Sequence, residues 1–219
     1  MVRENLTEIY NLLFESFGPQ HWWPGDGQLE IIVGAVLTQN TNWTNVEKAI
    51  ANLKAAGCLK PQKIHEIKAE KLAELIRPAG YFNIKAKRLK NLIDWLFDNY
   101  QGNLENIDSV KTSRLREELL SITGIGPETA DSIQLYAFER PVFVVDAYTA
   151  RIAARHGLIE PPFEYDQLQR LFMDNLDEDV HKFNEYHALL VRCGKEFCRP
   201  VARCAGCPLE KLPHKVEGE

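Results

Sequence analysis

The chain has 219 residues, a length that suits one large domain or two small ones sharing an interface. Its 45% hydrophobic and 26% charged residues are ordinary for a globular protein, and no apolar run approaches the roughly 20 residues that a membrane span needs. The net charge of −5, taken alone, argues against a nucleic-acid partner, because such proteins usually carry a basic surface. The N-terminal segment MVRENLTEIY has no apolar core of the kind found in secretory signals, so we expect a cytoplasmic protein.

Apolar residues recur at helical spacing along most of the chain, which predicts an all-α protein. The pattern begins with Leu6, Ile9 and Leu13, and the almost continuously apolar segment 29–36 predicts a buried central helix. The run 142–145 is strand-like but short, so we expect no sheet. Further helices are expected around 46–53, 89–96, 113–120, 127–137, 147–156, 165–176 and 179–194.

The segment 120–133, LSITGIGPETADSI, predicts two helices joined by a tight Gly-x-Gly turn. Gly124 and Gly126 permit positive φ and the close approach of another backbone, and Pro127 is placed to start the second helix. The exposed amides at that helix start favour an anion such as a DNA phosphate. An ordinary helix–helix turn is the alternative. The full pattern, with apolar residues on both sides, favours a DNA-binding hairpin.

This pattern resembles the helix-hairpin-helix glycosylases of the endonuclease III superfamily. That family places an aspartate downstream of its hairpin, and Asp146 in the segment VVDAYTAR (144–151) matches it. The resemblance implies that Asp146 stabilises an oxocarbenium-like sugar and positions or activates a water molecule. Asp146 is also suited to cap the helix that follows, and the two roles are compatible.

One position departs from the bifunctional members of the family. Those members carry a lysine two residues after the second glycine, which attacks the sugar and forms a Schiff base that leads to strand cleavage. Glu128 stands at that position here, and a carboxylate cannot form the imine. The resemblance therefore implies a monofunctional DNA glycosylase of base excision repair, without AP-lyase activity.

Aromatic residues near the N-terminus bear on the substrate. Trp22, Trp23 and Pro24, together with Trp43 after the buried helix, resemble the 3-methyladenine DNA glycosylases of the endonuclease III type. A purine methylated at such a ring nitrogen is cationic, and an electron-rich aromatic slot favours a cation once the base is flipped out of the duplex. Core packing is the alternative for any single tryptophan. The other functions left open are a glycosylase for uracil, mismatched thymine or an oxidised base, and a non-catalytic DNA-binding protein.

The resemblance also implies DNA contacts outside the hairpin. Gln39 matches a glutamine that fills the gap left by the flipped base, and Tyr81 matches a second wedge that stacks between bases. The basic run after Tyr81, which includes Lys85, Lys87 and Arg88, is expected to hold the flanking backbone. A buried Tyr81 and a solvated basic helix face are the structural alternatives.

Four of the five cysteines crowd into fifteen residues, which in a cytosolic chain favours metal or iron–sulfur binding over disulfides. The superfamily's iron–sulfur loop has the spacing C-x6-C-x2-C-x5-C. Cys198, Cys204 and Cys207 match its first three cysteines with one residue fewer in the first gap, and Pro213 stands at the fourth position. We expect Cys193 to complete a structural [4Fe–4S] cluster. A three-cysteine site with His214, a zinc site, or no metal remain open.

The expected architecture is all-α and two-lobed. A helical domain over 24–138 carries the hairpin, and 1–23 with 139–219 form a terminal domain that carries the cysteine loop. The expected partner is double-stranded DNA with a damaged base, which lies across the cleft between the lobes with Asp146 at its mouth. We expect a monomer without a membrane partner, associated with the nucleoid in a bacterium or archaeon.

Overall fold

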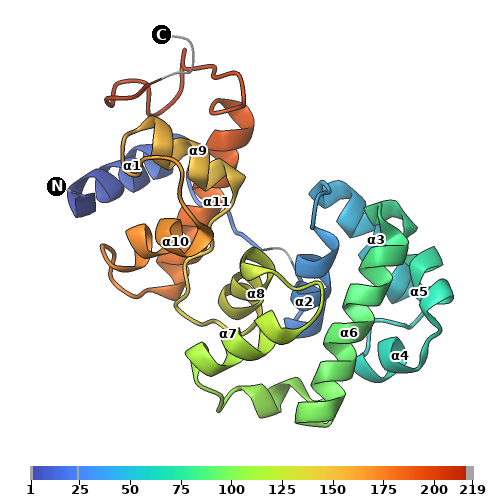
Figure 1. Cartoon of the computed structure of the whole chain (residues 1–219). Coiled ribbons are helices and arrows are strands. Elements are labelled where there is room, and N and C mark those ends of the chain that lie inside the picture. Colours follow the sequence, from blue (N-terminus) through green and yellow to red (C-terminus); the bar gives the residue numbers. More distant parts are fainter. Residues whose placement is uncertain (1, 24, 216–219) are drawn as a thin grey trace. The chain divides into compact units, whose positions relative to one another are not determined.

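The computed structural model describes residues 2–23 and 25–215. Throughout these residues the regular structure is helical and no β-strand occurs (Figure 1), which confirms the all-α prediction. None of the described helices is long and apolar enough to cross a membrane. The chain divides into two compact units. We call Trp23–Arg140 the hairpin unit, and Met1–Trp22 with Pro141–Glu219 the terminal unit.

The hairpin unit is built around one apolar helix, α2 (Gln28–Leu37). Its sequence QLEIIVGAVL has no polar residue after Glu30, and the helix is buried from Ile32 to Leu37. It packs against α3, α6, α8 and the π-helical turn η3. The other elements of this unit are α3 (Trp43–Ala55), α4 (Pro61–Glu66), α5 (Ala69–Leu75), the 3₁₀ turn η1 (Arg77–Ala79), α6 (Phe82–Tyr100), the 3₁₀ turn η2 (Leu104–Ile107), α7 (Thr112–Ser121), α8 (Pro127–Ser132) and η3 (Ile133–Ala137).

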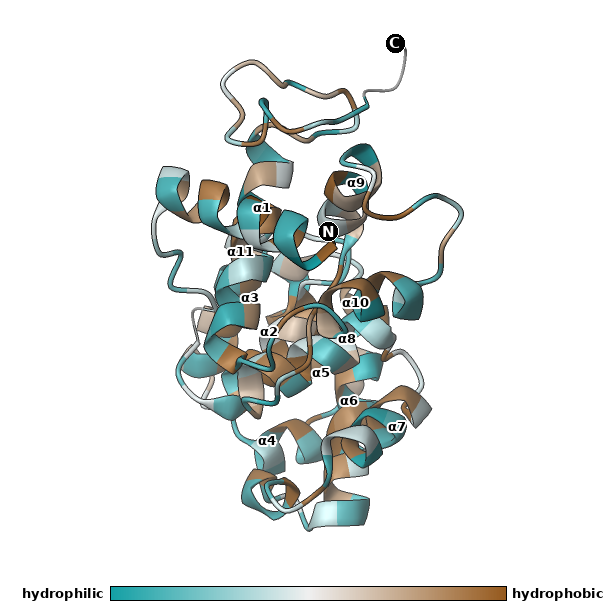
Figure 2. Cartoon of the chain, turned by 90° about the vertical axis from the view of Figure 1, so that its left-hand side faces the viewer, coloured by the Kyte–Doolittle hydropathy of each residue, from teal (hydrophilic) through white to brown (hydrophobic). Residues whose placement is uncertain are grey.

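The helices around α2 are amphipathic. In α6 the apolar residues Leu89, Leu92, Ile93 and Leu96 recur at three- and four-residue spacing, and all four are buried. Figure 2 shows both hydrophilic and hydrophobic residues along the ribbons of α3, α6 and α7. Burial of the apolar stripe therefore fixes which face of each helix meets the core.

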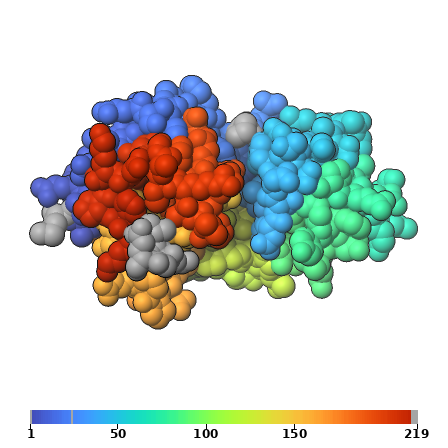
Figure 3. Space-filling model, turned by 90° about the horizontal axis from the view of Figure 1, so that it is seen from above, coloured from blue at the N-terminus to red at the C-terminus, as the bar shows by residue number. Residues whose placement is uncertain are grey.

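The terminal unit brings the two ends of the chain together. Its helices are α1 (Val2–Phe17), α9 (Ala147–Arg155), α10 (Tyr165–Met173) and α11 (Val180–Glu196). Helix α1 packs against α11, and Figure 3 shows the blue N-terminal residues beside the red C-terminal ones. The hydroxyl of buried Tyr186 on α11 donates to the carbonyl of Leu6 at 2.8 Å, which ties the two helices together.

The run 142–145 is an extended segment with no strand partner among the described residues. It is buried in an aromatic core, where the Phe143 ring stacks on Phe172 with centroids 4.2 Å apart. Gln169 donates to the carbonyl of Phe143 at 2.8 Å. Side-chain packing and this hydrogen bond hold the segment in place of the backbone hydrogen bonds of a β-sheet. The segment leads directly into Asp146, the residue before α9.

Candidate active site

Asp146 is the N-cap of α9, and its backbone is extended there. Its Oδ1 accepts one hydrogen bond from the amide of Thr149 at 2.8 Å and another from the Thr149 hydroxyl at 2.9 Å. These bonds satisfy an amide that the first helical turn leaves without a partner. The capping role that the sequence predicts for Asp146 is confirmed, and it occupies only one carboxylate oxygen.

The other oxygen of Asp146 faces a histidine. Oδ2 lies 3.8 Å from Nε2 of His187 on α11, and the side chains of Asp146 and His187 are only 11% and 7% exposed. Burial alone raises the pKa of Asp146, but the contacts with His187 and Thr149 outweigh it and hold the pKa below its usual value. Asp146 is therefore an anion at neutral pH, able to stabilise a developing positive charge. His187 could not be predicted from the sequence, because it meets Asp146 through packing of α9 on α11.

The hairpin lies between α7 and α8, as the sequence predicts. Gly124 has a φ of +100°, which strains any residue with a Cβ. Gly126 has a φ of −97°, so positive φ is required at only one of the two glycines. A Cβ placed on Gly126 would meet no described atom within 4 Å, so its surface is open to an approaching molecule. Glu128 is exposed in the first turn of α8.

Gln39 follows α2 and is bound to the hairpin. Its Nε2 donates to the hydroxyl of Thr129 at 2.9 Å and to the carbonyl of Gly124 at 3.2 Å. Its Oε1 accepts from the guanidinium of Arg88 on α6. Two residues that the sequence assigned to separate DNA contacts thus bind each other and the hairpin.

The basic run does not form one exposed cationic face. Lys85 is 1% exposed, and its ammonium donates to the carbonyls of Leu37 and Ala79 at 2.8 Å each. Burial, and then the neighbouring Arg88, lower the pKa of Lys85 to about 8. The prediction that Lys85 binds a DNA phosphate is therefore wrong, because its charge is already committed to helix-terminal carbonyls. Lys87 is exposed and remains available.

Tyr81 is exposed, as a wedge residue must be. It immediately precedes α6 and is 69% exposed, with a left-handed φ of +45°. A non-glycine residue in this conformation is uncommon and carries strain. Ile84, one turn further along α6, is also exposed at 54%. The alternative of a buried Tyr81 is excluded.

The structure brings two of the three predicted tryptophans together in the hairpin unit. Trp23 meets Trp43 edge to face with ring centroids 5.0 Å apart, and Tyr136 lies against Trp23 at 4.9 Å. Gly34 of α2 makes room for them, since a Cβ there would be 3.3 Å from the Trp23 indole nitrogen and 3.4 Å from Trp43. Tyr136 comes from the π-helical turn η3, which the sequence did not reveal. Such turns are frequent at functional sites.

The other two members of the predicted aromatic slot are Trp22 and Pro24. Trp22 belongs to the terminal unit, where the ammonium of Lys195 lies 5.8 Å from its ring centroid. Pro24 lies outside the residues that the structure describes. The described aromatic cluster is therefore Trp23, Trp43 and Tyr136.

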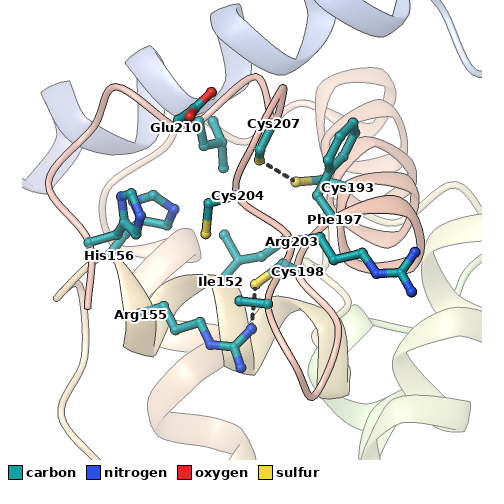
Figure 4. A pocket seen from close by; sticks show the side chains of 13 residues that line it. Ile152, Arg155, His156, Cys193, Phe197, Cys198, Arg203, Cys204, Cys207 and Glu210 are labelled. Carbon is teal, nitrogen blue, oxygen red and sulfur yellow. Dashed lines mark hydrogen bonds between the residues drawn. The ribbon is translucent and has the colours of Figure 1, made fainter. Parts of the chain in front are cut away.

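The four C-terminal cysteines line one cavity of about 380 Å³, part of which is open to solvent (Figure 4). The sulfur atoms of Cys193 and Cys207 are 3.9 Å apart, and the sulfur of Cys198 accepts from the guanidinium of Arg155 at 3.2 Å. The bond from Cys193, more than any other contact, lowers the pKa of Cys207 to about 7, while the same bond and burial raise the pKa of Cys193. No three potential ligands in the described part of the chain converge closely enough to hold a single metal ion.

Residues 33–178, more than half of the chain, match the family model of the HhH-GPD superfamily base excision DNA repair proteins. The chain belongs to this superfamily. The matched range contains Gln39, both hairpin glycines and Asp146, and it ends before the cysteine loop.

Individual members of the superfamily cover nearly the whole chain. A protein of Methanocaldococcus jannaschii, provisionally named a DNA repair glycosylase, is 49% identical over 95% of this chain and 96% of its own length. Endonuclease III of Thermotoga maritima is 30% identical over 78% of this chain and 74% of its own. The solved 3-methyladenine DNA glycosylase MagIII of H. pylori, bound to 1,N6-ethenoadenine, is 34% identical with a TM-score of 0.76. It matches 89% of this chain and 97% of its own. These likenesses confirm the resemblance predicted from the motifs.

Proposed function

We propose that this HhH-GPD protein is a monofunctional DNA glycosylase that hydrolyses the N-glycosidic bond of alkylated purines such as 3-methyladenine. It acts as a monomer on double-stranded DNA. The observation that carries the proposal is Asp146, a nearly buried carboxylate that stays ionised in a chain whose lysine position holds Glu128. The Asp146 carboxylate supplies the negative charge that stabilises the sugar cation during base hydrolysis. Glu128 stands in place of the nucleophilic amine that strand cleavage requires.

The reaction follows from the charge of Asp146. In a purine nucleotide methylated at a ring nitrogen, such as 3-methyladenine, the base is cationic, so the C1′–N bond breaks with its electron pair moving to the base. Asp146 stabilises the positive charge that develops on the sugar. A water oxygen then bonds to C1′ and gives its proton to Asp146 or to solvent. The product is a free base and an unbroken strand with an abasic site.

The aromatic residues supply selectivity in this proposal. Trp23, Trp43 and Tyr136 form an electron-rich cluster, and Trp22 already lies within cation–π range of Lys195. A cationic base gains more from such rings than a neutral base does. The similarity to MagIII, whose structure contains an alkylated-type adenine, 1,N6-ethenoadenine, supports purines as the substrate class.

The duplex is held by the hairpin and by two exposed residues of α6 and the turn before it. Gly126 leaves an open surface at the hairpin turn, and Tyr81 projects far enough to stack between bases. Lys87 is the exposed cation of the basic run and contacts the flanking phosphates. Gln39 is the second candidate to fill the gap that the flipped base leaves.

We also propose a [4Fe–4S] cluster held by Cys193, Cys198, Cys204 and Cys207. The donor set fits, because four thiol sulfurs line the same cavity and four thiolates are the usual ligands of such a cluster. His214 lines the cavity as well, which keeps the three-cysteine alternative testable. When bound, the cluster would link the loop to α11 and order it.

The test is base release from a panel of duplex oligonucleotides that carry 3-methyladenine, 1,N6-ethenoadenine, uracil, mismatched thymine or an oxidised base. We expect release of the alkylated purines. Excision of another lesion while the methylated purine persists would replace this substrate class, and no release at all would favour a non-catalytic DNA-binding protein. Borohydride treatment of the same reactions should trap no covalent complex. Trapping by the wild-type protein would reveal a lyase that uses a displaced lysine and would contradict the monofunctional assignment, and Glu128→Lys serves as the matched variant that places an amine at position 128.

A further inference from the structure

The side chain of Gln39 is fully engaged in the DNA-free protein. Both polar atoms of its amide are used: Nε2 binds Thr129 and Gly124, and Oε1 binds Arg88. Thr129, Gly124 and Arg88 lie 90, 85 and 49 residues away in the sequence, on α8, in the hairpin turn and on α6. A role confined to filling the gap in DNA does not explain these three hydrogen bonds in the DNA-free protein.

Two partners of Gln39 belong to the hairpin, one in its turn and one in the helix that follows. The carbonyl of Gly124 precedes Ile125, and the hydroxyl of Thr129 belongs to α8, which follows the turn. Thr129 is only 7% exposed, so its hydroxyl depends on partners within the protein. The single Nε2 of Gln39 therefore links the turn itself to the first residues of α8.

Arg88 on α6 contacts both the hairpin turn and Gln39. Its chain lies so near the turn that a Cβ on Gly124 would be 2.3 Å from the Arg88 Cγ. Arg88 also binds Gln39, so the glutamine, the arginine and the turn hold one another in place. The hairpin conformation is thus set by α6 and the loop after α2 as well as by its own sequence.

We propose that Gln39 is a positioning residue that holds the helix-hairpin-helix turn in its DNA-binding conformation through Thr129. The inference rests on the proposed function only in taking duplex DNA as the ligand. It differs from the gap-filling role, which operates after a base has left the stack. Gap filling requires Gln39 to leave its partners, whereas positioning requires it to keep them while the backbone is being bound.

Undamaged DNA distinguishes the two roles, because no lesion has to be flipped for its backbone to be bound. We expect Thr129→Val, which loses one hydrogen bond to Gln39, to weaken binding of an undamaged duplex at fixed ionic strength by roughly 3- to 10-fold. Gln39→Ala loses three hydrogen bonds and should weaken binding at least as much. Thr129→Ser keeps the hydroxyl and should bind like wild type. Thr112→Val, at the start of α7, is the matched control.

A double-mutant cycle tests whether Gln39 and Thr129 act as a pair. If Gln39 and Thr129 act through their shared hydrogen bond, the double variant should bind no more weakly than Gln39→Ala alone. Wild-type affinity of both single variants for undamaged DNA would overturn the inference and leave gap filling as the role of Gln39. Failure of wild type to bind any duplex would instead contradict the proposed function. Thermal melting shows whether each variant folds, and if Thr129→Val does not, Gln39→Ala decides the question.

Discussion

The two carboxylate oxygens of Asp146 have different partners. Oδ1 caps α9 through Thr149, and Oδ2 faces His187. The first contact fixes the orientation of the carboxylate, and the second helps to keep it charged despite its burial. A buried carboxylate without such partners would take up a proton and lose its ability to stabilise a cation.

Removing His187 should therefore raise the pKa of Asp146. Because the folded pKa is held below its usual value, the wild-type anion persists into mildly acidic solution. We expect His187→Asn to lose base release at a higher pH than wild type as the pH falls, in single-turnover rates measured across the acid limb. His181→Asn alters an exposed histidine of the same helix and is the control. Superimposable profiles of His187→Asn and wild type would show that His187 has no influence on the carboxylate.

Lys85 gives a second prediction at the residue scale. Its pKa is about 8 in the folded protein, whereas an unperturbed lysine, as in the unfolded chain, has a pKa of 10.5. Between these two pH values the unfolded chain therefore binds more protons than the folded protein. Folding is then increasingly favoured as pH rises through this window, and Lys85→Met should lack this contribution. The free energy of unfolding in urea, measured between about pH 7 and pH 10, should rise for wild type relative to Lys85→Met. Lys87→Met should follow wild type, and parallel curves for all three proteins would refute the buried, proton-releasing lysine.

At the scale of elements, the motif was predictable but the use of each residue in it was not. Spacing predicted the helices, the turn and the cap at Asp146, since these depend on local backbone chemistry. The basic run on α6 was predicted as one DNA-binding face. Lys85 instead supplies donors to helix-terminal carbonyls, and Arg88 binds Gln39. The side of α6 on which each cation lies, and the packing of other segments against it, decide which cation reaches solvent. A run of like charges in the sequence does not reveal either of them.

The two hairpin glycines should respond differently to alanine. Gly124→Ala introduces a Cβ at a φ of +100° and against Arg88, so we expect a loss of about 1–3 kcal/mol of unfolding free energy. Gly126→Ala has an allowed φ and open space, so its stability should stay within about 0.5 kcal/mol of wild type. Urea unfolding measures both. Equal losses would mean that the turn does not have the conformation described here.

At the scale of the whole molecule, the residues of the proposed function are divided between two units. Asp146, His187 and the cysteines belong to the terminal unit, whereas the hairpin, Tyr81 and the aromatic cluster belong to the hairpin unit. The proposed reaction needs both. The sequence predicted the family and most of these residues. It could not predict His187 or Tyr136, because one depends on packing of α9 against α11 and the other on a π-helical turn.

The cysteine loop gives a prediction at this scale. If Cys193 completes a [4Fe–4S] site, freshly purified protein should show the visible absorption of an iron–sulfur protein, and Cys193→Ser should lose most of it. Cys58→Ser changes a cysteine of the hairpin unit and should leave the spectrum intact. A spectrum that survives in Cys193→Ser but disappears in a His214 variant would assign the fourth ligand to the histidine.

The central claim is that Asp146 drives hydrolysis of an alkylated base without a lysine nucleophile. The most direct measurement is the single-turnover release of 3-methyladenine from an alkylated duplex by wild type and by Asp146→Asn. Asparagine keeps the shape and an oxygen for the Thr149 cap but removes the charge. We expect release by wild type and a rate lower by about 10²- to 10⁴-fold in the variant, with unchanged affinity for undamaged duplex. Equal rates in the two proteins would contradict this claim.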